Sequence, residues 1–234
     1  LRRFGKSVTS LLQFVSNPAL LADNPNFKYA DELSSVLAQG DGPKIRHTIK
    51  RTRELTNHGE KVLIWTSFVK NVEYLAEALR DLGSVYIHGG VDAGSDEDED
   101  TREGKIKKFH DDPRTMVLIA NPAAASEGIS LHTVCHYAIY LDRNFNAAQY
   151  LQSEDRIHRL GLKEGQKTVL EIVECADTID ETVRTRLELK IQRMAVALED
   201  TELNVTPYCT GSNDDLDDEL LDLEDMEAII AELA

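Results

Sequence analysis

The sequence lacks a phosphate-binding loop. Neither GxxxxGK[ST] nor GxGxxG occurs in its 234 residues, and no acidic box of the Walker B type follows a predicted strand. A glycine-rich loop with a lysine cradles nucleotide phosphates, and acidic residues hold the accompanying Mg²⁺. The chain is long enough to bury a full core. The length of the chain therefore predicts a folded domain. The missing phosphate-binding motifs argue against a free-standing nucleotide-binding enzyme.

Long apolar runs and paired cysteines are also missing. No run approaches the roughly 18 to 20 residues of a membrane span, and residues 1–22 lack the order of a signal peptide. We therefore expect no membrane partner and a cytoplasmic location, nucleoid-associated in a bacterium or nuclear in a eukaryote. Cys135, Cys175 and Cys209 form no CxxC pair, so neither a zinc site nor a disulfide framework is indicated.

Positive charge is absent from the C-terminal end. Residues 194–234 hold 13 acids and no lysine or arginine, and residues 92–100 hold six more acids. A net charge of −16 argues against a nucleic-acid partner, because phosphate contacts need local positive charge. Outside these two segments, however, 23 acids face 26 basic residues. A DNA-facing surface is therefore permitted.

The central part of the chain alternates short apolar runs with segments of helical spacing. This pattern predicts an α/β fold, with a parallel sheet covered by helices on both faces. The predicted strands are residues 62–65, 85–87, 116–120, 137–141 and 169–173.

Capping residues predict where the helices begin and end. Gly83 can end the helix after the first strand. Asn146 can begin a helix from about residue 147 to 160, which Gly161 ends. Near the N-terminus, Pro18 should end a helix at Ser16.

The remaining segments lie outside this core. Asp177 or Thr178 can open a long helix with an apolar stripe from Ile179 to Met194. Residues 90–101 are rich in glycine and acids and are typical of a mobile surface loop. After a second loop, the acidic C-terminal segment predicts an amphipathic helix.

Two arginines are the main candidates for chemistry. On the predicted helix, Gln152, Arg156 and Arg159 fall at i, i+4 and i+7, so they share one face. Paired guanidiniums suit a triphosphate, because each is always charged and offers a planar fork of donors. The alternative is a solvated face on which Glu154 and Asp155 pair with the arginines.

Residues 152–161, preceded by Asp142 and Asn146, resemble motif VI of the Swi/Snf-related ATPases of helicase superfamily two. Three other segments resemble family motifs in the required order: residues 61–68 resemble motif IV, residues 86–109 the segment with Gly89, Gly90 and Arg102, and residues 117–131 motif V. Residues 12–20 are similar to the stretch that joins the two lobes of these enzymes. The resemblance covers about residues 8–198.

This resemblance implies a RecA-like fold of the P-loop NTPase type, with an N-terminal linker helix and a C-terminal acidic helix. It divides the chain into an inter-lobe linker (1–43), a C-terminal RecA-like lobe (44–198) and an acidic tail (199–234). The implied activity is that of the C-terminal lobe of an ATP-dependent double-stranded DNA translocase. The N-terminal RecA-like lobe of the same polypeptide would bind most of the ATP and Mg²⁺, so this chain alone would be inactive.

The resemblance also implies roles for individual residues. Arg156 and Arg159 would be the catalytic arginine fingers, and no residue of this chain would bind metal. The residues implied to contact ATP are Gln152, Gly128, Glu127 and Asp155. Those implied to contact DNA are Thr66, Ser67, Phe68, His88, Asn121, Ser126 and Ser130.

Other interpretations remain open. Thr66 and Ser67 could instead cap the helix that follows them, and the small residues of motif V could form an ordinary tight turn. Motif V departs from the family at Pro122, Ala123, Ala125 and Ser126, and Phe145 replaces the usual tryptophan. These departures favour the alternative of a catalytically degenerate nucleic-acid-binding or protein-interaction module. The acidic helix could bind a protein partner, cover the DNA face as an autoinhibitor, or stay solvated.

Overall fold

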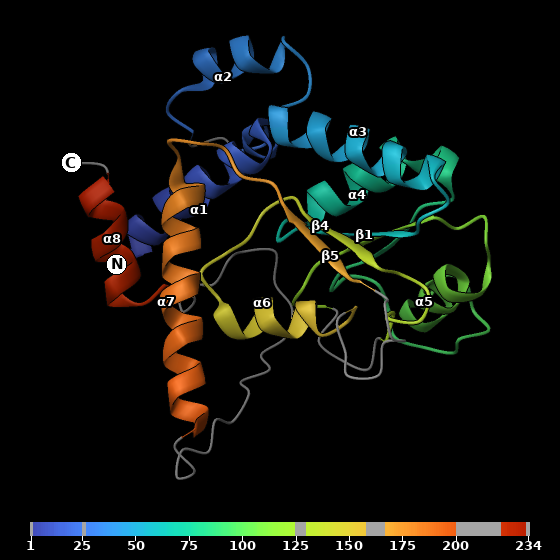
Figure 1. Cartoon of the computed structure of the whole chain (residues 1–234). Coiled ribbons are helices and arrows are strands. Elements are labelled where there is room, and N and C mark those ends of the chain that lie inside the picture. The colour runs from blue at the N-terminus through green and yellow to red at the C-terminus, as the bar shows by residue number, and fades with distance from the viewer. Residues whose placement is uncertain (1, 25–26, 125–129, 158–166, 200–220, 233–234) are drawn as a thin grey trace.

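A five-stranded parallel sheet forms the centre of the computed structural model, which describes residues 2–24, 27–124, 130–157, 167–199 and 221–232. The strand order is β2-β3-β1-β4-β5 (Figure 1). The strands are β1 (Val62–Trp65), β2 (Val85–Ile87), β3 (Val117–Ala120), β4 (Tyr137–Tyr140) and β5 (Val169–Ile172). All five predicted strands are confirmed, three of them one residue shorter than expected.

Helices cover both faces of the sheet, which confirms the predicted fold class. α3 (Pro43–Asn57) and α4 (Val69–Ala78) lie over one face, where Val62 and Ile64 of β1 are buried. α5 (Arg102–Asp111) and α6 (Ala147–Glu154) lie over the other, against Leu63 and Trp65. Successive side chains of β1 thus enter opposite cores, as the pleat of a strand requires.

Gly83 lies where the sequence predicts a helix end. It follows η2 (Arg80–Leu82), a 3₁₀ turn after α4, and adopts the left-handed φ of +66°. A Cβ atom at this position would lie 2.3 Å from the carbonyl oxygen of Arg114. Glycine is therefore required both by the backbone conformation and by the close approach of the neighbouring loop.

A third apolar cluster joins the two ends of the chain. It packs α1 (Arg2–Ser16) and η1 (Pro18–Leu21) against α7 (Ile179–Glu199) and α8 (Leu223–Glu232). Figure 1 shows these helices at the end of the molecule opposite α5. Both the predicted break after Ser16 and the predicted start of the long helix at Ile179 are confirmed. No helix of the described residues is long and apolar enough to cross a membrane.

A buried ion pair holds α7 against α3. The ammonium of Lys44 lies 2.9 Å from Oδ2 of Asp180, and the two side chains are 2% and 9% exposed. The same oxygen accepts a hydrogen bond from the backbone N–H of Cys175.

A further N-terminal helix, α2 (Ala30–Leu37), precedes α3 and buries Leu33.

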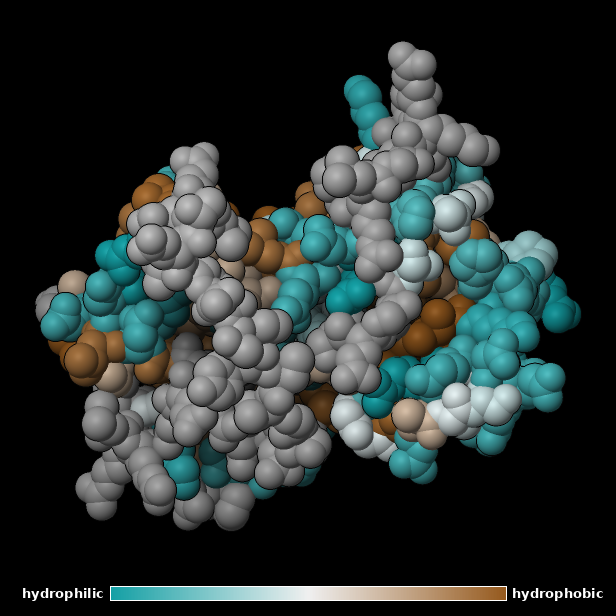
Figure 2. Space-filling view, turned by 90° about the horizontal axis from the view of Figure 1, so that it is seen from below, coloured by the Kyte–Doolittle hydropathy of each residue, from teal (hydrophilic) through white to brown (hydrophobic). Residues whose placement is uncertain are grey.

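The acidic residues 90–101 form a largely exposed surface segment, as the sequence predicts, and two of these acids pair with lysines of α5. Lys107 lies 2.8 Å from Asp96, and Lys108 is hydrogen bonded to Glu99. The lysines of α5 supply the countercharge that the sequence pattern did not reveal. In the view from below, this end of the molecule is largely hydrophilic (Figure 2).

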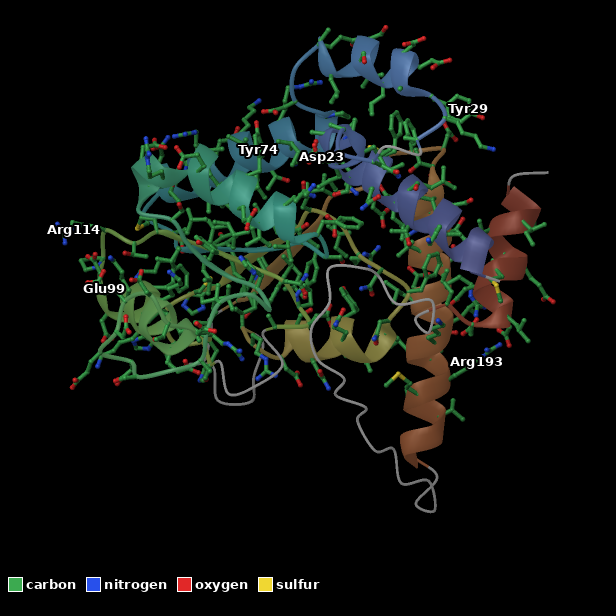
Figure 3. All side chains as sticks on the ribbon, turned by 180° about the vertical axis from the view of Figure 1, so that it is seen from behind. Asp23, Tyr29, Tyr74, Glu99, Arg114 and Arg193 are labelled. Carbon is green, nitrogen blue, oxygen red and sulfur yellow. The ribbon has the colours of Figure 1, made fainter. Side chains whose placement is uncertain are left out.

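The acidic helix α8 docks on the basic face of α7. Asp225 is fully buried and accepts hydrogen bonds from Nε of Arg186 at 2.7 Å and from Nζ of Lys190 at 2.6 Å. Arg193, which projects from α7 (Figure 3), lies 2.7 Å from Glu224. These contacts are internal to the chain, so they lend no support to an external protein partner for this helix.

We predict that replacing Asp225 releases α8. In Asp225→Ala, the buried Arg186 and the partly buried Lys190 lose a partner, and breaking a buried pair typically costs about 3 kcal/mol or more. Glu227→Ala, on the exposed side of the same helix, should change stability by less than about 0.5 kcal/mol. Thermal unfolding and hydrogen exchange of the α8 amides measure both effects. Equal protection of α8 in the two variants would contradict the assignment.

Acid should release the same helix. Hydrogen bonds from Arg193 and Arg186 lower the pKa of Glu224 below its ordinary value of 4.5. A carboxylate with a lowered folded-state pKa stabilises the docked state above that ordinary value, and the contribution disappears as pH falls through the lowered pKa. NMR signals of α8 should therefore stay unchanged from pH 7 down to the ordinary pKa of 4.5 and shift as the pH falls further. Signals that stay constant until the whole chain unfolds in acid would show that these ion pairs do not hold the helix.

Candidate functional site

The segment that carries the candidate arginines begins as a helix and ends as a turn. The side chain of Asn146 caps α6 by accepting a hydrogen bond from Gln149 N at 3.0 Å, as predicted. The prediction that the helix runs to about residue 160 is wrong, because α6 ends at Glu154. Beyond it, the backbone makes the tighter bonds Arg156 N to Ser153 O and Ile157 N to Glu154 O.

Burial of Ile157 explains this early end. Its side chain is fully buried in the core on the α5–α6 side of the sheet, so the chain must turn inward there. The turn is held by Leu131 N, which donates to Arg156 O at 2.9 Å. Arg156 therefore follows the helix that carries Gln152 rather than sharing a helical face with it.

The environment of Arg156 is largely dry. Its side chain is 8% exposed, whereas Gln152 is partly exposed and Asp155 is exposed. Because Leu131 lies next to Ser130, the end of the motif V segment meets the turn that carries Arg156. Arg159, Glu127, Gly128 and Ser126 lie outside the described residues.

Aromatic side chains anchor α6 to the sheet below it. The hydroxyl groups of Tyr140 on β4 and Ser153 on α6 are 2.7 Å apart. The ring of Tyr150 packs beside Tyr140, and the guanidinium of Arg143 lies over it at 5.4 Å. Burial raises the pKa of both tyrosines. They remain neutral over the physiological range and serve as fixed supports for the turn.

Two residues predicted to contact DNA are buried. Thr66 is fully buried, and its hydroxyl donates to Oδ2 of Asp142 at 2.7 Å. Phe68 is 7% exposed and packs in the cluster around α1 and α7. Neither side chain is available to DNA in this structure, because Thr66 is hydrogen bonded to a buried carboxylate and Phe68 packs in an apolar cluster. Ser67, between them, is partly exposed.

The other predicted DNA contacts lie mostly at the carboxyl edge of the sheet. Asn121, after β3, donates from Nδ2 to Ser67 O at 2.9 Å and accepts at Oδ1 from Ala123 N. His88, after β2, stacks on Tyr86 and accepts at Nδ1 from Gly90 N at 3.1 Å. The structure thus brings Asn121 and Ser67 together.

Ser130 lies elsewhere, near the turn that carries Arg156. Its hydroxyl is 2.9 Å from Nδ1 of His132, and the residue is partly exposed.

Sequence reasoning missed the role of Asp142, which entered only as part of the motif VI resemblance. The residue is 5% exposed, and Oδ1 accepts a hydrogen bond from Ser67 N at 2.6 Å while Oδ2 accepts one from Ser16 Oγ at 2.6 Å. An acidic residue directly after a buried strand was the available signal. Its partners, however, come from segments too far apart in the chain to be paired from sequence.

Comparisons with known proteins agree with this architecture. The family of helicase conserved C-terminal domains matches residues 44–161. Helicase SWR1 of Candida albicans is 33% identical over 144 residues, which cover 59% of this chain and 8% of that protein. The ATP-dependent helicase fft3 of Schizosaccharomyces pombe is 28% identical over 151 residues, covering 64% and 16%. The chain therefore spans a small part of these relatives.

A solved structure shows the same fold. The crystal structure of the C-terminal part of the Fun30 ATPase domain is similar with a TM-score of 0.54 and 20% sequence identity. The similarity covers 73% of this chain and 62% of that one.

The two neighbouring hydroxyl groups of the motif IV segment should behave differently when removed. Thr66→Val should destabilise the chain by about 1 to 3 kcal/mol, because it takes a donor from a buried carboxylate. Ser67→Ala should leave stability within about 0.5 kcal/mol, because the Ser67 hydroxyl bonds to none of the described residues. Denaturant unfolding of both variants tests this contrast, and equal losses of stability would refute it.

Proposed function

We propose that this chain, which belongs to the helicase conserved C-terminal domain family and is a C-terminal lobe of the Swi/Snf-related type, serves an ATP-dependent double-stranded DNA translocase. In this role it supplies arginine fingers and part of the DNA track. The preceding RecA-like lobe of the same polypeptide supplies the phosphate-binding loop and the carboxylates for Mg²⁺.

The position of Arg156 carries this proposal. Arg156 as a residue is only 8% exposed, so its guanidinium keeps its charge in poorly solvated surroundings, where it acts strongly on a neighbouring anion. Phosphoryl transfer places charge on the equatorial phosphate oxygens, and an arginine from another element stabilises that charge, typically by roughly 10³ to 10⁵ in rate. In our proposal Arg156 does this for a nucleotide bound between the lobes, and Arg159 assists it.

Four neighbouring residues complete the nucleotide side of this lobe in the proposal: Gln152, Asp155, Glu127 and Gly128. Gln152 and Asp155 are supported by their place in the segment that leads to Arg156. Glu127 and Gly128 are supported by the family resemblance of motif V. Without the lysine and carboxylates of the preceding lobe, these groups have no complete phosphate site, so the chain alone would not hydrolyse ATP.

The proposed DNA track follows the carboxyl edge of the sheet. Ser67 and Asn121 meet there, and His88 lies on the next strand end. Backbone N–H groups and hydroxyls at such positions suit phosphate contacts that fix position without reading sequence. Ser126 and Ser130 extend the same proposal to motif V. Thr66 and Phe68, which are buried, hold the loop that carries Ser67 in place.

A nuclear location fits the full-length protein better than the cytoplasmic one expected from the sequence. The two fungal helicases described above are joined by the lymphoid-specific helicase of Homo sapiens, which is 26% identical over 147 residues. For a eukaryotic enzyme that acts on DNA, the nuclear alternative follows, and the cytoplasmic prediction has no support.

A catalytically degenerate binding module is the second candidate function. The altered motif V, with Pro122, Ala123 and Ala125, is the observation that favours it. The sequence of the preceding lobe discriminates the two candidates, because an active enzyme requires the phosphate-loop lysine and a degenerate module does not.

Replacing Arg156 in the full-length protein tests the leading proposal. We expect Arg156→Ala to lower DNA-stimulated ATP turnover by about 10³-fold or more. Arg156→Lys should recover little, because an ammonium lacks the planar fork. Arg114→Ala, which removes a side chain that is 91% exposed, serves as the control and should turn over like wild type. Near wild-type turnover in Arg156→Ala, at unchanged thermal stability, would rule out the finger role.

A further inference from the structure

The sheet has a topological switch point that is closed by the chain itself. β1 and β4 are neighbours in the sheet. After β1 the chain continues to β2 at one edge of the sheet, and after β4 it continues to β5 at the other edge. In open α/β sheets, the crevice beyond the carboxyl ends of two such strands is the usual place for a ligand. Here Asp142, after β4, accepts hydrogen bonds instead from Ser16 at the end of α1 and from Thr66 after β1.

Asp142 is the centre of this closure. Its carboxylate accepts three hydrogen bonds, from Ser16 Oγ at 2.6 Å, Thr66 Oγ1 at 2.7 Å and Ser67 N at 2.6 Å. None of the described lysine or arginine side chains forms an ion pair with it. The donors of α1 and of the loop after β1 therefore satisfy the carboxylate jointly.

A second layer of amides extends the network along the linker. Nδ2 of Asn71, on α4, donates to Ser16 Oγ, and Nδ2 of Asn17 donates to Asn71 Oδ1, both at 2.9 Å. Oδ1 of Asn17 accepts from Ala19 N and so starts η1. Ser16, Asn17 and Asn71 are each at most 6% exposed.

A buried polar group that loses its partner is costly, so this network resists partial opening. Moving α1 away from the lobe would remove the Ser16 hydroxyl from Asp142 and from Asn71 at once. Phe68 adds an apolar link, because it packs with Val8 and Leu12 of α1 in one cluster. The linker helix α1 and the loop after β1 are thus held together by the hydrogen-bond network around Asp142 and by the apolar packing of Phe68.

We propose that Asp142 is a positioning residue that couples the inter-lobe linker to the DNA-facing loop at Ser67. This inference rests on the proposed function, in which movement between the lobes accompanies ATP turnover. One carboxylate oxygen holds the backbone of Ser67 and the other holds Ser16. A displacement of α1 is therefore transmitted to the part of the lobe that contacts DNA.

The test uses the full-length protein and compares two variants with a control. Ser16→Ala removes the linker side of the network without removing the carboxylate, and Asp142→Asn removes the charge. Thr115→Val is the control, because it removes another buried hydroxyl that bonds to an aspartate, Asp112, before β3. The measurements are ATP turnover with and without duplex DNA, and the rate of DNA translocation.

Coupling predicts a change in the ratio of DNA translocated to ATP hydrolysed. In Ser16→Ala, translocation per ATP hydrolysed should fall by about tenfold, the effect of losing one charge-assisted hydrogen bond. DNA-independent turnover should stay within about twofold of wild type. Asp142→Asn should show the same loss or a larger one, and Thr115→Val should keep the wild-type ratio.

The outcomes separate the two proposals. An unchanged ratio in Ser16→Ala, in a wild type that translocates, would overturn the coupling alone. A parallel fall of turnover and translocation with lower thermal stability in all three variants would assign the network a purely structural role and also overturn it. A wild type with no DNA-stimulated turnover would overturn the proposed function, and the coupling with it.

Discussion

A buried carboxylate must find donors for its charge, and Asp142 finds three of them in two segments that are distant from it in sequence. Ser16, Thr66 and Ser67 all donate to it. This requirement fixes the end of α1 over the carboxyl edge of the sheet, and it fixes the backbone of the loop after β1. The switch point is thus filled from within, and our proposal places the chemistry of the lobe elsewhere, at the turn that carries Arg156.

Charge complementarity organises both ends of the molecule around this centre. Lysines of α5 pair with the acidic segment before it, and the basic face of α7 pairs with α8. Outside the two acidic segments, 23 acids face 26 basic residues, which permits a DNA-facing surface. Five of those basic residues, Lys107, Lys108, Arg186, Lys190 and Arg193, pair with acids of the two segments. In our proposal, the positive charge that meets DNA therefore comes mainly from other residues.

Local patterns predicted the sheet well, and long-range contacts limited the rest. Short apolar runs gave all five strands, most clearly β1 and β3, which are buried along their whole length. Asn146 marked the start of α6 because capping is a local interaction. The predicted end of α6 was wrong because Ile157 is buried in the core, and this tertiary contact overrides the helical spacing of the sequence. Thr66 was ambiguous for the same reason, since its partner lies 76 residues away.

We propose above all that the arginines of this lobe act on a nucleotide held by another lobe. The most direct test measures ATP turnover by the purified 234-residue chain and by the full-length protein, each with and without duplex DNA. The account predicts no turnover above background for the chain alone and DNA-stimulated turnover for the full-length protein. Turnover by the chain alone at the rate of the full-length protein would contradict it.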